Sequence, residues 1–262
     1  MKLSRTKIDP VILAIIGILS PIVTVWWIAT NFNFYSILVF CIIAWLVGIN
    51  TTIFAHRAWT HKSWNPNKYL TLFGLSLFSV SMIGNSIGWV SIHREHHRYS
   101  DTEKDPHSPN FKSRLWIQFF PYFNKVKVQY VLDLTRDSFH MWFAKNYWYI
   151  MIVWMIALTA INPSILVFWF AVIGLSSMKM HSINSLGHNT PKWLLPINAS
   201  DKSCNSVILA VINLNSGEAW HRNHHEDPMN YCFGKRWYEI DPAAWMIRLL
   251  VMINIATFNT RD

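Results

Sequence analysis

The sequence predicts an all-α integral membrane protein, with four transmembrane helices in two hairpins and a cytoplasmic histidine-rich cap that includes interfacial amphipathic helices. Two observations carry this prediction. Apolar and aromatic residues make up 52% of the 262 residues and charged residues only 14%, whereas soluble domains have about 25% charged residues. The uncharged residues also fall in long runs. We treat residues 1–262 as a single domain, and the aromatic content excludes a disordered chain.

The first hairpin is expected between Pro10 and His56, where no Asp, Glu, Lys or Arg occurs. Two helices that each cross a hydrocarbon layer of ~30 Å need roughly 40 residues, which this run supplies. Residues 30–33, Thr-Asn-Phe-Asn, are mostly polar and form a short turn within it. This turn divides the run into predicted spans at 11–29 and 34–54.

The second hairpin is expected between Asn146 and Met178, which is also free of charged side chains. Asn162 and Pro163 interrupt this run, because proline begins a helix well but disrupts its interior. The predicted spans are 147–161 and 164–178. The remaining segments, 55–145 and 179–262, form the predicted cap.

Neither hairpin turn contains Lys or Arg, so all 23 basic residues lie in the amino-terminal, middle and carboxy-terminal segments. The positive-inside rule then places both termini and the cap in the cytoplasm of a multi-pass membrane protein. The net charge of +9 suits a surface beside anionic membrane lipid. No nucleic-acid partner is predicted, because no stretch combines clustered Lys and Arg with stacking aromatic residues.

Eight of the twelve histidines fall in three short boxes, at 56–61, 93–97 and 221–225. In the second and third boxes the spacing is i, i+3, i+4, so each can direct three imidazoles from one helix face toward one point. In the first box, a spacing of five residues separates two side chains by ~140° on a regular helix. His56 and His61 must therefore approach a metal from different sides, or the helix must end between them. The position at the end of the second span favours a helix end.

A shared site requires all three boxes to lie on the same side of the membrane. Between the first two boxes, only Tyr69 to Trp89 is apolar enough to cross, and a single crossing would separate the ligands by ~30 Å. We therefore expect this segment to lie along the membrane interface as an amphipathic helix.

Eight imidazoles exceed what one ion can bind, so the boxes predict two metal ions. A closed zinc site would need only four ligands, and the surplus favours redox-active ions with open positions for O₂. A histidine-rich metal carrier is an alternative, but its ligands would follow a path within the spans. Outside the boxes, His140 is interpreted as a buried core residue.

The motifs HRAWTH, HREHHRYSDTEKDPH, NSLGH (184–188), GEAWHRNHH and YEIDPAAWMIRLL occur in this order. Together they resemble the membrane fatty acyl desaturase family, in particular its delta-9 acyl-CoA desaturase branch, over residues 50–252. The boxes alone also fit membrane hydroxylases and ketolases. The NSxxH element and the DPH after the second box favour a desaturase, and a membrane hydroxylase using the same centre is the alternative.

The resemblance implies a centre of two iron ions that uses O₂ as co-substrate to introduce a cis double bond, at the delta-9 position in this branch, into a saturated long-chain acyl substrate. Asn184 would reach one iron through a water. The implied direct ligands are nine histidines: His56, His61, His93, His96, His97, His188, His221, His224 and His225. His181 is interpreted as no ligand, and His107 as a loop or supporting residue.

Carboxylates are expected to accept the second N–H of the ligating rings. The candidates are Glu95, Asp101, Asp105, Glu218 and Asp227. The chain shows no redox module of its own, so electrons must come from an external donor. In the family this is cytochrome b5 or a ferredoxin, each with its reductase.

Three residues are predicted to bind the substrate. Trp89 matches the family pattern, and Ala44 and Gly48 lie twelve and eight residues before His56, close to one face of the second span. These two small residues would line a tunnel for a chain of roughly sixteen to eighteen carbons, since each buried CH₂ contributes about 0.8 kcal/mol. Alternatively, they only permit close helix packing. His181 and Ser91 depart from the acyl-CoA pattern, which leaves CoA, carrier protein and lipid open as the acyl carrier.

Overall fold

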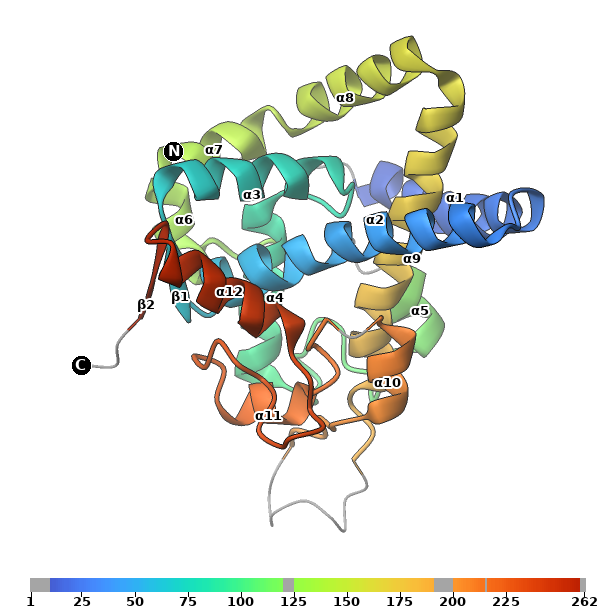
Figure 1. Ribbon diagram of the computed structural model, residues 1–262. Coiled ribbons are helices and arrows are strands. Elements are labelled where there is room, and N and C mark those ends of the chain that lie inside the picture. Colours follow the sequence, from blue (N-terminus) through green and yellow to red (C-terminus); the bar gives the residue numbers. More distant parts are fainter. Residues whose placement is uncertain (1–9, 120–124, 191–199, 215, 260–262) are drawn as a thin grey trace.

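The computed structural model describes residues 10–119, 125–190, 200–214 and 216–259, and these are mostly helical (Figure 1). The helical elements are α1 (Pro10–Thr30), α2 (Phe34–Asn50), the π-helix η2 (Thr51–Thr60), α3 (Lys68–Val80), α4 (Ser86–Tyr99), α5 (Arg114–Phe119), the 3₁₀ turn η4 (Val128–Tyr130), α6 (Leu132–Arg136), α7 (Ser138–Lys145), α8 (Tyr147–Ile161), α9 (Pro163–Leu186), α10 (Val207–Ile212), α11 (His221–Glu226) and α12 (Pro242–Met252). Two short strands, β1 (Trp64–Pro66) and β2 (Ala256–Phe258), pair antiparallel.

Three helical stretches of the described residues are long and apolar enough to cross a membrane: α1, the continuous α2 and η2, and α9. The pair α7 and α8 gives a fourth if it is counted as one span, although it bends by 64° between its two helices. Three to four apolar helices fit a multi-pass membrane protein, as predicted.

The two predicted turns between apolar helices are present. Asn33 caps α2 and Asn162 caps α9, each accepting a hydrogen bond from a backbone N–H. Two helices continue past the predicted span ends, the second helix to Thr60 and α9 to Leu186. Both extensions carry polar residues that are buried, so hydropathy alone did not reveal them.

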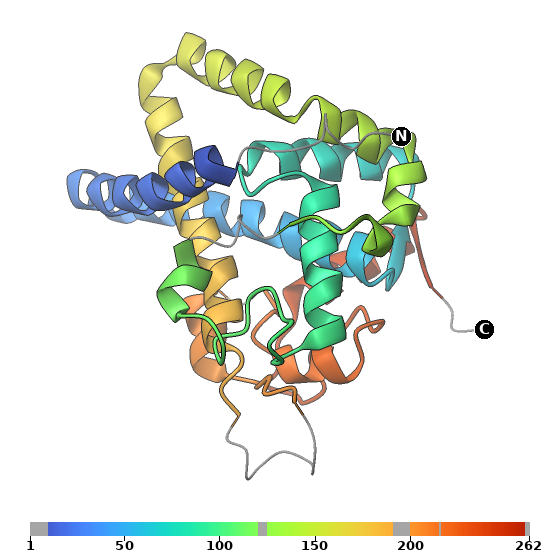
Figure 2. The same ribbon diagram turned by 180° about the vertical axis from the view of Figure 1, so that it is seen from behind.

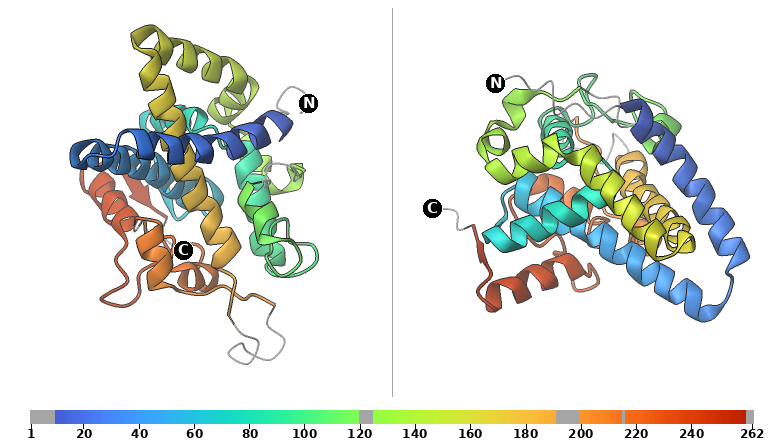
Figure 3. Two further views of the ribbon diagram at one scale, coloured as in Figure 1. Left: turned by 90° about the vertical axis from the view of Figure 1, so that its right-hand side faces the viewer. Right: turned by 90° about the horizontal axis from the view of Figure 1, so that it is seen from above.

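Helix α9 packs against both arms of the first hairpin, which diverge from their turn (Figure 3). The hydroxyl of Thr24 in α1 donates to the carbonyl of Ala171 at 2.7 Å. A Cβ atom at Gly174 would lie 2.3 Å from the carbonyl oxygen of Ser20. Only glycine therefore allows α9 to approach α1 this closely, as small residues do in membrane helix pairs.

The segment from Tyr69 to Trp89 is not one helix. It comprises α3 and the start of α4, which run in different directions (Figure 2). The break between them includes Met82 and Gly84, both with positive φ. At 1.5 Å per residue, the 13 residues of α3 extend only ~20 Å, too short for a hydrocarbon layer of ~30 Å. Its interfacial location stays a prediction.

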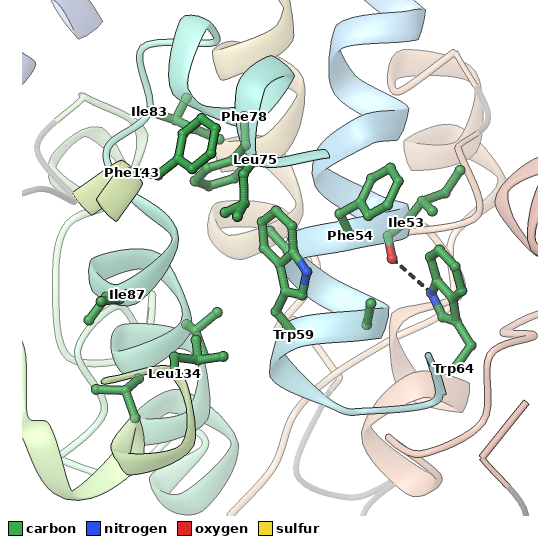
Figure 4. Close-up of a cluster of buried hydrophobic side chains, with 14 of the residues drawn as sticks. Ile53, Phe54, Trp59, Trp64, Leu75, Phe78, Ile83, Ile87, Leu134 and Phe143 are labelled. Atoms are coloured by element: carbon green, nitrogen blue, oxygen red, sulfur yellow. Dashed lines mark hydrogen bonds between the residues drawn. The ribbon is translucent and has the colours of Figure 1, made fainter. Parts of the chain in front are cut away.

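The largest buried cluster fixes the end of the second helix against α3 and α4 (Figure 4). Trp59 of η2 packs edge-on against Phe78 of α3. The Trp64 indole, fully buried, donates to the carbonyl of Ile53 at 3.0 Å. These contacts hold η2 in position, and η2 carries His56.

Candidate metal centre

The π-helix η2 explains how the first box places two histidines together. The backbone N–H of His61 bonds the carbonyl of His56 at 3.2 Å, so five residues close one turn, as in a π-helix. The helix does end at Thr60, between the two histidines, as predicted. However, the wide turn before that end is what brings their rings to one side, with centroids 5.0 Å apart.

All nine predicted histidine ligands lie in two adjacent groups, in each of which the ring nitrogens are within 4.8 Å of one another. The first histidine group consists of His56, His61, His93, His97 and His224. The second histidine group consists of His96, His188, His221 and His225. Ring centroids of His97 and His225, one from each group, are 4.3 Å apart, so the groups are neighbours.

The prediction that the second and third boxes each direct three rings to one point is wrong. Each box is divided between the groups: His93 and His97 join the first and His96 the second, whereas His221 and His225 join the second and His224 the first. At 100° per residue, positions i and i+4 differ by only ~40°, but i+3 and i+4 differ by ~100°. The i+3 ring therefore points to the neighbouring group.

The spacing of the ring nitrogens fits metal binding. The Nε2 atoms of His56 and His224 are 2.9 Å apart, and those of His188 and His221 are also 2.9 Å apart. Two metal–nitrogen bonds of ~2.1 Å that meet at a right angle place the nitrogens roughly 3 Å apart. Other buried ring nitrogens, including Nε2 of His61 and His96, have no hydrogen-bond partner, as expected for atoms that bind a metal.

Burial favours the neutral, metal-binding form of His61, His93, His221 and His224. The pKa of His93 is well below its usual value because burial removes water and because the ring of His56 lies nearby. Burial also lowers the pKa of His221, with His188 as the next cause. A neutral imidazole has a free lone pair for a metal ion.

Carboxylates fix four rings by accepting the Nδ1 proton. Glu218 bonds His56 at 2.7 Å, Asp105 bonds His96 at 2.9 Å, Asp101 bonds His188 at 2.7 Å and Asp201 bonds His225 at 2.8 Å. Three of these acids were predicted and Asp201 was missed. Glu95 instead pairs with Lys127, and Asp227 is the residue after α11.

The Asp101 carboxylate is held ionised by its contacts. Burial acts to raise its pKa, but hydrogen bonds from His188, from the hydroxyl of Ser108 and from the backbone N–H of Lys202 outweigh burial and lower the pKa to about 2. The carboxylate thus brings a negative charge next to the second histidine group.

A family model described as fatty acid desaturase matches residues 32–251. The chain belongs to the fatty acid desaturase family. It is 30% identical over 238 residues to delta-9 acyl-lipid desaturase 1 of Arabidopsis thaliana, covering 87% of this chain and 76% of that protein. It is 26% identical to sn-1 stearoyl-lipid 9-desaturase of Anabaena variabilis, covering 88% and 86%. An acyl-CoA C20 delta5-desaturase of Anemone leveillei is 30% identical, with coverages of 79% and 68%.

This desaturase is an oxidoreductase that acts on fatty acyl substrates, as the motifs predicted. The names of its relatives include both acyl-lipid and acyl-CoA enzymes, and both delta-9 and delta-5 positions. The likeness therefore leaves open the acyl carrier and the position of the double bond.

The remaining histidines of the desaturase have other surroundings. His140 is buried and its Nδ1 is 2.8 Å from the hydroxyl of Ser86, so the core interpretation is confirmed. His181 belongs to neither histidine group, and its Nδ1 contacts the Gln118 carbonyl at 2.8 Å. His107 stacks on His96 with ring centroids 4.2 Å apart, next to the second group.

A cavity leads from the metal centre between α2 and α9. Ligand candidates of both groups line it: His56 and His93 of the first, and His221 of the second. Asn184 also lines it, and its contact to a metal through water stays a prediction. Trp89 lines the cavity and stacks on His93, with centroids 4.8 Å apart and planes 19° apart.

The two small residues of α2 have different surroundings. Gly48 lines the cavity. Ala44 is fully buried against α9, where its carbonyl accepts a hydrogen bond from Ser176 at 2.9 Å, and it is not among the described residues that line the cavity. For Ala44, the observed contacts are those of close helix packing, the alternative that the sequence left open.

Proposed function

We propose that the protein is an O₂-dependent di-iron desaturase that introduces a cis double bond, at the delta-9 position, into a saturated long-chain fatty acyl substrate. The observation that carries this proposal is the pair of histidine groups, nine rings in all, of which His56, His93 and His221 line one cavity. Imidazole is a suitable ligand for iron, and the surplus of ligands favours a two-metal site.

The reaction needs a metal because a methylene group has no acidic proton and no leaving group. Bound iron would supply the oxidation: O₂, two electrons and two protons are consumed, two neighbouring C–H bonds are broken, and a C=C bond and two waters result. The protein contributes position. Trp89 covers His93 at the cavity wall, and Gly48 leaves space beyond it.

The electrons must come from an external donor, for which cytochrome b5 or a ferredoxin with its reductase is our proposal. The net charge of +9 suits an acidic protein partner on the cap. We also propose that the cap and both termini face the cytoplasm. Cysteine reporters at Asn65 and Glu103, which flank the segment from Tyr69 to Trp89, should then both react with an impermeant reagent from the cytoplasmic side only. Labelling from opposite sides would contradict the proposal.

The decisive experiment supplies the purified protein with a stearoyl substrate, as the CoA thioester and as a phospholipid, together with O₂ and a reduced electron donor. We expect an octadecenoyl product with a cis bond at carbon 9, identified by mass spectrometry. A hydroxylated product would instead support the membrane hydroxylase alternative. No oxygen-dependent product with any carrier, from protein that retains its metal, would refute both.

A further inference from the structure

One basic side chain in the cavity wall, that of Lys179, has no ion-pair or hydrogen-bond partner among the described residues. Lys179 of α9 is 5% exposed and lines the cavity, and its Nζ has no hydrogen-bond partner among the described residues. The ammonium lies close to Gly48, where an added Cβ atom would be 3.6 Å from Nζ. Glycine at this position therefore leaves the ammonium open to the cavity.

The neighbouring groups do not neutralise this cation. Glu218 is the one carboxylate among the described residues that line the cavity, and it is held by His56 at 2.7 Å. The hydroxyls of Ser176 and Thr52 donate to carbonyls of α2. A buried ammonium without a counter-charge is costly, and a neutral hydrogen-bond acceptor only partly offsets that cost.

We propose that Lys179 binds a carboxylate carried by the substrate chain, several methylenes from the carbon atoms that are oxidised. Lys179 precedes Asn184 by five residues, and Gly48 precedes His56 by eight, which correspond to roughly 8 and 12 Å along a helix. An extended acyl chain spans this distance with part of its length. The inference rests on the proposed function only in taking the occupant of the cavity to be a fatty acyl chain.

A carboxylate is favoured over other polar groups for two reasons. A carboxylate carries a full negative charge and would supply the counter-charge that the Lys179 ammonium needs. The cavity wall also includes apolar side chains, such as Val47, Met180 and Ile183, which would contact the methylenes of a fatty chain that carries this carboxylate. Desaturation itself requires no such charge, so Lys179 would select among fatty chains.

Binding measurements on the detergent-purified holoprotein at pH 8 test this proposal. We expect palmitic acid to bind at least about tenfold more tightly than hexadecan-1-ol, a gain typical of a charge-assisted pair. Lys179→Met should remove this preference and leave alcohol binding unchanged, whereas Lys179→Arg should retain it. Lys145→Met, which alters an exposed lysine of α7, is the matched control and should bind as the unaltered protein does.

Equal binding of acid and alcohol by the unaltered protein, or a preference that survives in Lys179→Met, would overturn the proposal. If Lys179→Met does not fold, Lys179→Gln with a checked melting temperature replaces it. The carboxylate can be that of a free fatty acid or the distal one of an esterified chain. If palmitic acid binds more tightly than monomethyl hexadecanedioate, the source is a free fatty acid. If monomethyl hexadecanedioate binds more tightly, the source is the distal carboxylate of an esterified chain. Either result supports the ion pair between Lys179 and a carboxylate.

The binding experiment on Lys179 and the desaturation assay can succeed or fail independently of each other. Desaturation of stearoyl substrates without any carboxylate preference would refute the role of Lys179 and leave the function intact. A carboxylate preference lost in Lys179→Met, without any oxygen-dependent product, would support the binding site and refute the desaturase.

Discussion

The two histidine groups are held by the protein in different ways. In the first, one ring of five bonds a carboxylate, that of Glu218. Aromatic side chains support other rings: Trp89 stacks on His93, and Phe233 packs against His224 with centroids 4.4 Å apart. In the second, three rings of four bond carboxylates, those of Asp101, Asp105 and Asp201.

This difference gives the two sites different electrostatics. A carboxylate on Nδ1 orients the ring and makes the opposite nitrogen a stronger ligand. Three such acids also bring more negative charge near the second group, which stabilises a cation there. We therefore expect the second group to bind its metal more tightly than the first.

The largest effect is expected from removing one ring of each group. His224→Ala should empty the first group and His96→Ala the second, because each change removes a ring nitrogen from that group. Desaturase activity should be abolished in both, and the metal content should fall from about two ions per chain to about one. Activity assays and elemental analysis of the purified variants measure this.

Both variants should still insert in the membrane, because the spans bury their apolar surface without the metals. His140→Ala, outside both groups, is the control and should retain both ions. Active protein with a single tightly bound ion would contradict this prediction, since the two histidine groups would then not be two metal sites.

Acidification should protonate rings of both histidine groups and destabilise the folded protein. Burial, with neighbouring rings, lowers the pKa of His61 and His97 in the first group and of His225 in the second. Between these lowered values and about 6.5, the unfolded chain binds more protons than the folded chain. The free energy of unfolding should therefore fall as the pH drops below about 6.5, by roughly 1.4 kcal/mol per pH unit for each extra proton.

Metal loss should accompany this destabilisation, because protonated imidazole cannot bind a metal. Melting temperature and metal content, measured from pH 8 to pH 5 in the same detergent, check the expectation. A melting temperature and metal content that stay constant down to pH 5 would show that the rings do not require the neutral form.

Changes to the carboxylates should have intermediate effects on metal affinity and activity, and these effects should differ between the two histidine groups. Asp101→Asn keeps the size of the side chain but removes the charge next to His188, and Glu218→Gln does the same beside His56. We expect losses of about 10–100-fold in metal affinity or activity, with Asp101→Asn lowering the occupancy of the second group and Glu218→Gln that of the first. Metal titration followed spectroscopically distinguishes the sites. Equal loss from both sites in either variant would mean that the acids act on the fold as a whole.

The sequence predicted which histidines gather but not how they are shared. Spacing identified the boxes because i, i+3 and i+4 lie on one side of a helix. Which part of one box joins which part of the other depends on how α4 and α11 are oriented relative to each other, which is tertiary information. The π-helical turn before His61 was likewise hidden, because local sequence did not indicate a turn of five residues.

The acids were predicted only where they stand close to a histidine in the sequence. Asp101 and Asp105 follow the second box directly, and Glu218 precedes the third. Asp201 lies 24 residues from His225, its partner, in a segment without regular secondary structure, so no local pattern marked it. Ala44 and Gly48 share a helix face in the sequence, but only the position of α9 showed that they have different neighbours.

The smallest effect concerns the cavity that both groups face. Gly48→Tyr would place a ring in the cavity, so it should shift the preference toward shorter acyl chains while both histidine groups keep their metal. Ala44→Tyr, one turn away, would instead force a ring into the contact with α9, where no cavity is lined by this residue. It should lower yield and melting temperature, since overpacking a tight contact typically costs about 1–3 kcal/mol. Product profiles from a mixture of C12 to C18 substrates, with metal content and melting temperature of each variant, separate the two outcomes. If Gly48→Tyr loses metal and fold together, or leaves the chain-length preference unchanged, Gly48 serves only helix packing and the acyl chain follows another path from the histidines.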